Sequence, residues 1–89
     1  MTTLAFTPNL ARHVDAPGAT VRGDSLHAAL EAYFTANPRV RGYVLDDQGA
    51  VRQHVAIFVN QRLIRDRQGL TDPIGEDDEI FVAQALSGG

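Results

Sequence analysis

Cysteine is absent from this sequence of 89 residues, and so is lysine. Without cysteine the chain cannot form disulfides, thiolate metal sites, a cysteine nucleophile or a Cys-x-x-Cys redox centre. All eight basic residues are arginine. Such use of arginine in place of lysine is typical of a GC-rich genome. The lack of lysine also leaves the chain without a side-chain amine that an activated acyl group can modify.

Long apolar runs are missing too, so no segment has the length of a membrane span. Residues 1–8 contain no basic region followed by an apolar stretch, so we expect no signal peptide and a cytoplasmic location. The net charge of −3 and the pI of about 5.4 argue against nonspecific binding to nucleic acid. We therefore expect neither a membrane nor a nucleic acid among the partners.

Groups that could carry out chemistry within the chain are scarce. The three histidines, His13, His27 and His54, lie far apart and lack the spacing of metal ligands. Neither serine stands in a nucleophile-elbow motif, and the sequence has no glycine-rich phosphate loop. We expect a protein that is not an enzyme, has no catalytic residue in the strict sense, and binds no metal and no cofactor itself.

The composition is typical of one folded domain. Apolar residues make up 44% of the chain and charged residues 21%, which is enough apolar surface for a modest core. No internal repeat or low-complexity segment divides the sequence. We expect the domain to span residues 1–85, followed by a flexible tail over residues 86–89.

One helix is clear from the pattern of apolar residues. Asp24 or Ser25 can cap its N-terminus with a side-chain oxygen. Asn37-Pro38 stops the helix, because the residue before proline avoids the helical conformation. The apolar stripe repeats at the helical period and consists of Leu26, Leu30, Tyr33 and Phe34.

Short strands account for the rest of the pattern. Residues 3–6 and 10–14 alternate and predict an antiparallel hairpin. Further strands are predicted at residues 43–45, 51–59, 63–64 and 79–85, with a long polar connection at 65–78. The strands 51–59 and 79–85 are apolar on both faces, which places both inside the sheet and the first in a central, doubly covered position.

The predicted fold is α+β, with the elements in the order β-β-α-β-β-(β)-β. A single helix must cover one face of the sheet, and a right-handed crossover makes the first and last strands parallel neighbours. This is a β-grasp (ubiquitin-like) roll with a mixed four- to five-stranded sheet and one main helix on one face. A ferredoxin-like sandwich is the alternative, but it requires a second helix that the pattern does not show.

The chain ends on Leu86-Ser87-Gly88-Gly89, directly after the last predicted strand. Two glycines end a chain by chance in roughly 0.5% of proteins at average glycine usage, so a frayed end is the alternative to a function. A terminal carboxylate can attack the α-phosphate of ATP and become an acyl adenylate. Glycine has no Cβ, so the last residues can pass a narrow channel, and four residues reach about 13 Å.

The sequence resembles the ThiS/MoaD family of small sulfur-carrier proteins over nearly its whole length. The segments that carry this resemblance are Ser-Leu-His-Ala-Ala-Leu at residues 25–30, His-Val-Ala-Ile-Phe-Val-Asn at 54–60, Gly-Leu-Thr-Asp-Pro-Ile at 69–74, Asp-Glu-Ile-Phe-Val at 78–82 and Ala-Leu-Ser-Gly-Gly at 85–89. Two positions depart from the family pattern. Asp77 stands where glycine is common before the last strand, and Gln84 stands where longer members often have proline.

The resemblance implies a role for the terminal carboxylate. An E1-like enzyme would adenylate Gly89 with ATP and magnesium, and a persulfide or sulfide donor would replace AMP to give a thiocarboxylate. A downstream acceptor enzyme would then receive the sulfur for cysteine-type, molybdopterin or other thio-metabolite synthesis. Leu86, Ser87 and Gly88 would thread the tail into the activating enzyme.

Partner contacts are expected on the last strand. Phe81, Ala83 and Ala85 alternate on one face of it, which makes that face a candidate docking surface. The acidic run at residues 76–79 is either a solvated turn or a contact with basic residues of the activating enzyme. Two other functions stay open: a ubiquitin-like modifier linked through Gly89 to target lysines, and a β-grasp interaction domain that is never activated.

Overall fold

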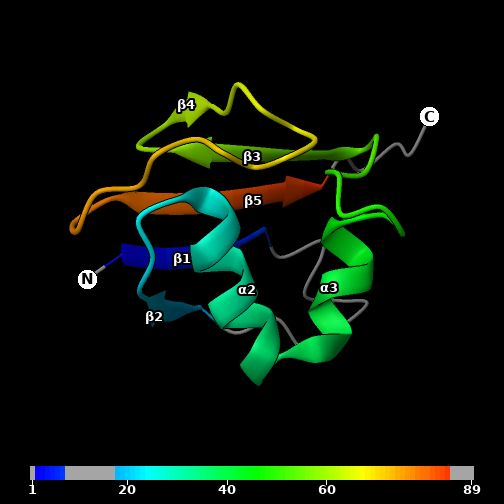
Figure 1. The fold of residues 1–89 in the computed structure, drawn as a ribbon, viewed down its shortest axis with the longest axis horizontal. Helices are drawn as coiled ribbons and strands as arrows, with labels where there is room; N and C mark the ends of the chain where they lie inside the picture. Colours follow the sequence, from blue (N-terminus) through cyan, green and yellow to red (C-terminus); the bar gives the residue numbers. More distant parts are fainter. Residues whose placement is uncertain (1, 8–17, 85–89) are drawn as a thin grey trace.

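The computed structural model describes residues 2–7 and 18–84 (Figure 1). The strands form one five-stranded sheet in the order β2-β1-β5-β3-β4. Neither helix in these residues is long and apolar enough to cross a membrane. In chain order the elements are β1 (Thr2–Phe6), β2 (Ala19–Val21), α2 (Leu26–Ala36), α3 (Pro38–Val44), β3 (Val55–Val59), β4 (Arg62–Leu63) and β5 (Glu79–Gln84).

Strand β5 is the centre of the sheet. It pairs in parallel with β1, where Thr3 lies opposite Glu79, and antiparallel with β3, where Phe58 lies opposite Phe81. The predicted parallel pairing of the first and last strands is therefore confirmed. Strand β3 is an inner strand but not the central one, because only the two-residue β4 lies beyond it.

Both helices lie over the same face of the sheet, here called the inner face (Figure 1). Side chains alternate along each strand, so every second one points toward the helices. The strand residues with the least exposure are all of this kind: Leu4, Ile57, Ile80 and Val82. The mixed sheet with helices on one face is the predicted β-grasp roll. Neither of the helices in residues 2–7 and 18–84 lies on the opposite, outer face.

Helix α2 begins and ends where the sequence predicted. The backbone N–H of Ala28 donates to the Oγ of Ser25 (3.2 Å), so Ser25 rather than Asp24 caps the helix. At the other end, the backbone N–H of Asn37 donates to the carbonyl of Tyr33 (2.9 Å). All four residues of the predicted apolar stripe are buried, so the helical period identified the core side of α2 correctly.

A second helix, α3, occupies Pro38–Val44, and the predictions of a strand at residues 43–45 and of a single helix were wrong. Proline is favoured at the first position of a helix, because its fixed φ is helical and the N–H it lacks would have no partner there. The proline that ends α2 therefore also begins α3. Val40 and Val44, four residues apart, are buried by this helix.

Two strand boundaries also differ from the predictions. The strand beside β1 is β2 at Ala19–Val21, while the predicted strand 10–14 lies outside the described residues. Strand β3 begins at Val55 rather than at residue 51, because Val51 makes only an isolated bridge to Leu45. The number of strands in the described sheet is at the upper end of the predicted four to five.

Asp66 organises the long connection between β4 and β5. Its Oδ1 accepts hydrogen bonds from the backbone N–H groups of Gln68 and Gly69, and its Oδ2 accepts from the hydroxyl of Thr71 (2.7 Å). These bonds, with the Thr71 hydroxyl first and Gly69 next, lower the pKa of Asp66 to about 2. Within this turn Leu70 points into the core and is 1% exposed.

Replacing Asp66 with Asn is expected to flatten the acid limb of the stability curve. The pKa of an unfolded aspartate is about 3.9, so the folded carboxylate stabilises the native state above that pH. Its contribution is lost as the pH falls from about 4 to about 2, through the folded-state pKa. Urea unfolding at a series of pH values measures this slope, with exposed Asp47→Asn as the control. Equal slopes for both variants and the wild type would contradict the assignment.

Candidate functional site

The predicted site begins where the chain leaves the C-terminal end of β5. The backbone N–H of Gln84 donates to the Oγ1 of Thr7 (3.4 Å), and the N–H of Thr7 donates to the carbonyl of Val82 (3.1 Å). On its other side Gln84 lies opposite Val55 of β3. The last described residue is thus held by both neighbouring strands. The predicted tail and docking residues beyond it lie outside the described residues: Ala85, Leu86, Ser87, Gly88 and Gly89.

The outer face of the sheet carries a cluster of apolar side chains next to this exit. Phe58 lies between two cross-strand neighbours, Phe81 on β5 and Leu63 on β4. Phe81 is 42% exposed and Leu63 is 57% exposed. We call this cluster the outer-face patch; its members are Ala56, Phe58, Leu63, Phe81 and Ala83. A contiguous exposed apolar patch on a folded domain is typical of an interaction site.

Sequence reasoning found only part of the outer-face patch. Phe81 and Ala83 were predicted to share one face of the last strand, and the structure places both on the outer face. That this face docks a partner stays a prediction. Ala56 and Phe58 were expected to be covered by a second layer, but they are only partly buried, because both helices lie on the inner face. Leu63 was missed, although its exposure follows from its place on a two-residue edge strand.

An open groove of about 770 Å³ adjoins the end of β5. Ala83 and Gln84 line it from β5, and His54 lines it from the turn before β3. The side-chain oxygen Oε1 of Gln84 is buried and has no hydrogen-bond partner among the described residues. An unpaired buried acceptor costs about 1–3 kcal/mol of folding free energy, so a hydrogen-bond donor that reached Gln84 Oε1 through the groove would be favourable.

A smaller hollow of about 430 Å³ lies farther along β5. Phe58 and Phe81 line it, together with Gln61 from the turn between β3 and β4 and Glu79 from the start of β5. Gln61 follows Asn60 in this turn, and both have positive φ angles of 70° and 52°. That geometry is usual for a two-residue hairpin turn, and it holds the turn beside Glu79.

Two residues of the acidic run at 76–79 are bonded to the turn between β3 and β4. The Oδ2 of Asp78 accepts from the backbone N–H of Gly75 (2.6 Å), and its Oδ1 accepts from the Nδ2 of Asn60 (2.8 Å). These two hydrogen bonds, with Gly75 the stronger cause, lower the pKa of Asp78. The Oδ1 of Asn60 in turn accepts from the N–H of Glu79 (2.9 Å). Asp78 therefore joins the β3–β4 turn to the start of β5.

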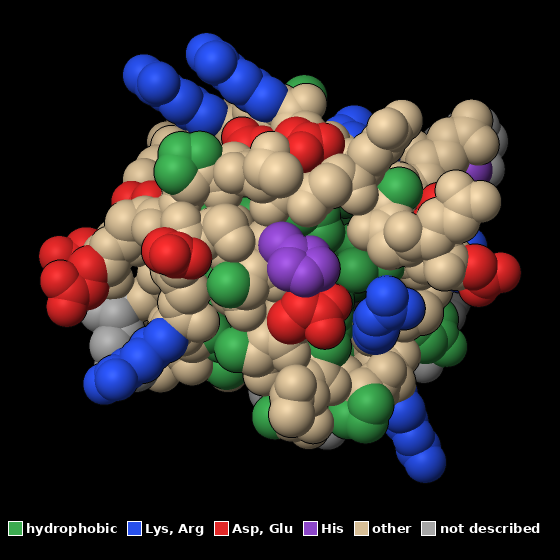
Figure 2. Space-filling view, viewed as in Figure 1, with side chains coloured by type: hydrophobic (Ala, Val, Ile, Leu, Met, Phe, Trp, Pro, Cys, Tyr) green, Lys and Arg blue, Asp and Glu red, His purple; other side chains and the backbone are tan. Residues whose placement is uncertain are grey.

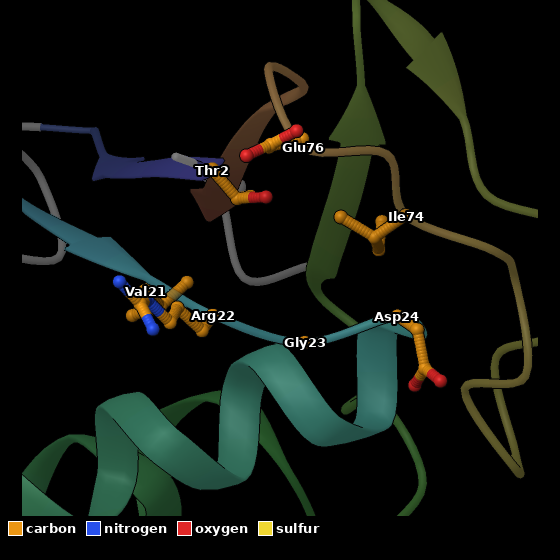
Figure 3. Close-up of a pocket in the computed structure, with 7 residues that line it drawn as sticks. All are labelled: Thr2, Val21, Arg22, Gly23, Asp24, Ile74 and Glu76. Carbon is orange, nitrogen blue, oxygen red and sulfur yellow. The ribbon is translucent and has the colours of Figure 1, made fainter.

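A third hollow, of about 450 Å³, lies beside the start of β1 and the segment before β5 (Figure 3). Its lining includes Thr2 at the start of β1, Arg22 and Asp24 before α2, and Glu76 before β5. Because β1 and β5 run in parallel, the starts of both strands are remote from the tail. This hollow therefore does not belong to the predicted site.

The helix side of the molecule offers no comparable patch in the view of Figure 2. Exposed hydrophobic side chains there are scattered among acidic and basic ones rather than gathered in one area. Within residues 2–7 and 18–84, no three histidine or acidic side chains are placed to hold a metal ion.

The sheet order, the parallel pairing of β1 with β5 and the helices on one face define a ubiquitin-like β-grasp protein. The sequence profile of the ThiS family matches residues 11–89, and the chain belongs to this family. The resemblance read from the sequence is thereby confirmed. The protein is therefore a ubiquitin-like β-grasp member of the ThiS family.

Solved structures give the same fold. SAMP1 from Haloferax volcanii matches with 23% identity and a TM-score of 0.77 over 99% of this chain and 98% of that one. CysO from Mycobacterium tuberculosis matches with 21% identity and a TM-score of 0.80 over 97% and 100%. A chain of the BexX/CysO complex from Amycolatopsis orientalis has 14% identity and a TM-score of 0.83 over the full length of both. Among curated proteins the search finds no match.

Proposed function

We propose that this protein is a sulfur carrier whose Gly89 carboxylate is activated by an E1-like enzyme and converted to a thiocarboxylate. The observation that carries this proposal is the ThiS family match, which continues through residue 89 and so includes the terminal Gly-Gly. The described sheet supports it, because the central strand β5 leads into that segment. The carrier works in the cytoplasm, where its nucleotide and its enzymes are present.

The chemistry divides between the carrier and its partners. A carboxylate oxygen of Gly89 attacks the α-phosphate of ATP, held with magnesium by the activating enzyme, and pyrophosphate leaves. Hydrosulfide attacks the carbonyl carbon, and the bond to AMP breaks to give the thiocarboxylate directly. A persulfide donor first forms an acyl disulfide as AMP leaves, and a second thiol then attacks the donor's sulfur, which forms a disulfide with the donor and releases the thiocarboxylate. One oxygen of the carboxylate is replaced by sulfur, and this chain supplies no catalytic group.

In this reaction the carrier contributes a folded domain and a narrow C-terminal segment. In this proposal residues 1–85 act as the body, and Leu86, Ser87, Gly88 and Gly89 are the segment that enters the activating enzyme; four residues span at most about 13 Å. Because glycine lacks a Cβ, the two terminal residues enter a channel too narrow for side chains. The anchoring of Gln84 between β1 and β3 gives the tail a fixed starting point.

The outer-face patch docks the activating enzyme in this proposal. It is exposed, apolar and continuous with the strand from which the tail departs. The structure of CysO in a complex with BexX supports the idea that a chain of this fold works by binding a larger protein. A donor from that enzyme can also reach the unpaired Oε1 of Gln84 beside the groove.

Replacing Phe81 with Ser is expected to raise the KM for the carrier in adenylation by about 10- to 100-fold, with kcat nearly unchanged. Truncating a central aromatic anchor of an interface costs about 1–3 kcal/mol of binding. Tyr43→Ser on α3 is the matched control, because Tyr43 is 39% exposed and lies away from the sheet. Steady-state kinetics of pyrophosphate release measures both variants. A KM for Phe81→Ser equal to that of the control would contradict docking through this face.

The test of the carrier function is the intact mass of the protein after incubation with ATP, magnesium, a sulfide source and the activating enzyme of the same genome. We expect a gain equal to the exchange of one oxygen for sulfur, mapped to Gly89. No gain, with the enzyme active on another carrier, would contradict the proposal. Reconstitution with acceptor enzymes of cysteine-type, molybdopterin and other thio-metabolite synthesis then identifies the acceptor.

A ubiquitin-like modifier is the second candidate, and the likeness to small archaeal modifier protein 1 of Haloferax volcanii favours it. The Gly89 carboxylate would then form an amide with lysines of target proteins. Because this chain has no lysine, its conjugates would not extend through its own side chains. Conjugates in a cell extract that disappear on deletion of Gly89 would support this function. A β-grasp interaction domain that is never activated would tolerate that deletion.

A further inference from the structure

Glu79 is the one charged side chain on the outer face of the described strands. The outward positions on β1 and β2 are Thr3, Ala5 and Thr20, and those on β3, β4 and the rest of β5 belong to the outer-face patch. Glu79 alternates with buried Ile80 and is exposed. A single carboxylate at the edge of an apolar surface is a specific electrostatic feature rather than part of a general acidic field.

The hollow beside Glu79 has two aromatic walls. Phe58 and Phe81 are cross-strand partners, and with Gln61 and Glu79 they enclose about 430 Å³. The faces of phenylalanine rings attract cations within about 6 Å of the ring centre. A cationic side chain with a long apolar stem can therefore make three contacts here. Its stem and its charged group pack against the two rings, and its charge pairs with the carboxylate.

Two other carboxylates of the acidic run, those of Asp78 and Glu76, are placed differently. Asp78 uses both oxygens for hydrogen bonds to Gly75 and Asn60. Glu76 lines the hollow beside the start of β1, together with Thr2. Of these three carboxylates, Glu79 alone borders the outer-face patch.

We propose that the hollow formed by Phe58, Phe81, Gln61 and Glu79 receives an arginine side chain of the activating enzyme. The inference rests on the proposed docking of that enzyme on the outer-face patch. The planar guanidinium group stacks on an aromatic ring and pairs with a carboxylate through two parallel hydrogen bonds. Glu79 then selects the partner by charge, while the phenylalanines supply most of the buried apolar area.

Two carboxylate variants with the same loss of charge test this contact. Glu79→Gln is expected to raise the KM for the carrier in adenylation by about five- to tenfold and to weaken the salt dependence of KM, with kcat unchanged. Glu76→Gln is the matched control and is expected to change KM by less than about twofold. A KM for Glu79→Gln within twofold of the wild type, or equal effects of both variants, would overturn the inference.

A double-mutant cycle tests whether the ring and the carboxylate serve one side chain. Phe81→Leu keeps an apolar group but removes the aromatic face, so Glu79→Gln should have a smaller effect on KM in that background. An unchanged effect would mean that the two groups act separately and would overturn the shared site. Failure of the proposed function is recognised independently, because the wild type would then show no exchange of oxygen for sulfur at Gly89 in the intact-mass experiment.

Discussion

Deleting Gly89 is expected to abolish formation of the thiocarboxylate while the fold stays intact. The carboxylate of the shortened chain, now on Gly88, would stop about 3.5 Å short of the α-phosphate. A misplacement of about 1 Å can already cost a hundredfold in rate, so thiocarboxylation should fall by more than that factor. The described sheet and core are built from residues 2–7 and 18–84, so thermal unfolding should not change.

The controls for this experiment separate the position of the carboxylate from the composition of the tail. Adding one alanine after Gly89 should block the reaction as the deletion does, because the carboxylate is again displaced. Ser87→Ala should retain most of the activity, since it keeps the length of the tail and both glycines. Intact mass spectrometry measures all three variants. Thiocarboxylation of the deleted chain at the wild-type rate is the result that would exclude the carrier function.

Gly23→Ala is expected to lower the free energy of unfolding by about 2–3 kcal/mol, as overpacking at a rigid contact does. A Cβ at Gly23 would lie 2.6 Å from the backbone nitrogen of Ala29. That nitrogen cannot move freely, because its N–H donates to the carbonyl of Ser25 (3.0 Å) in the first turn of α2. The chain between β2 and α2 would have to shift instead. Urea unfolding measures the difference.

Gly42 provides the matched control, because the same change is expected to have the opposite sign there. It lies in α3, and a Cβ at this position would meet no atom within 4 Å. Alanine in a helix interior is more stable than glycine by about 0.5–1 kcal/mol, so Gly42→Ala should stabilise the protein. If Gly23→Ala were as harmless as Gly42→Ala, the close packing of the segment before α2 would be wrong.

Much of the sheet and one helix could be predicted because their signals are local and strong. The stripe of α2 repeats over three turns, and the serine cap and the following proline mark its two ends. β1 has five residues whose apolar side chains alternate, and β5 has six residues of which the four inner ones are all apolar. The parallel pairing of these two strands followed from the requirement that one helical layer cover one sheet.

The missed elements lack such signals. α3 has only seven residues, and its first residue, Pro38, is equally a stop signal for the helix before it. β2 has three residues, Ala-Thr-Val, which carry no period that separates a strand from a loop. β3 is apolar on both faces, and such a pattern does not say whether the second face is covered.

The sequence by itself determined the class of fold, the core side of α2 and the family pattern that ends in Gly-Gly, since each is encoded in neighbouring residues. Its lack of cysteine also excluded thiol chemistry. The tertiary structure alone decided which face of the sheet the described helices leave uncovered and which acidic residue borders that face. Both helices pack on the inner face, so Phe58 and Leu63 join Phe81 on a free surface. Hydrogen bonds to Gly75 and Asn60 occupy Asp78, whereas its neighbour Glu79 points out from the sheet. These outcomes depend on contacts between residues far apart in the chain, which no local pattern records.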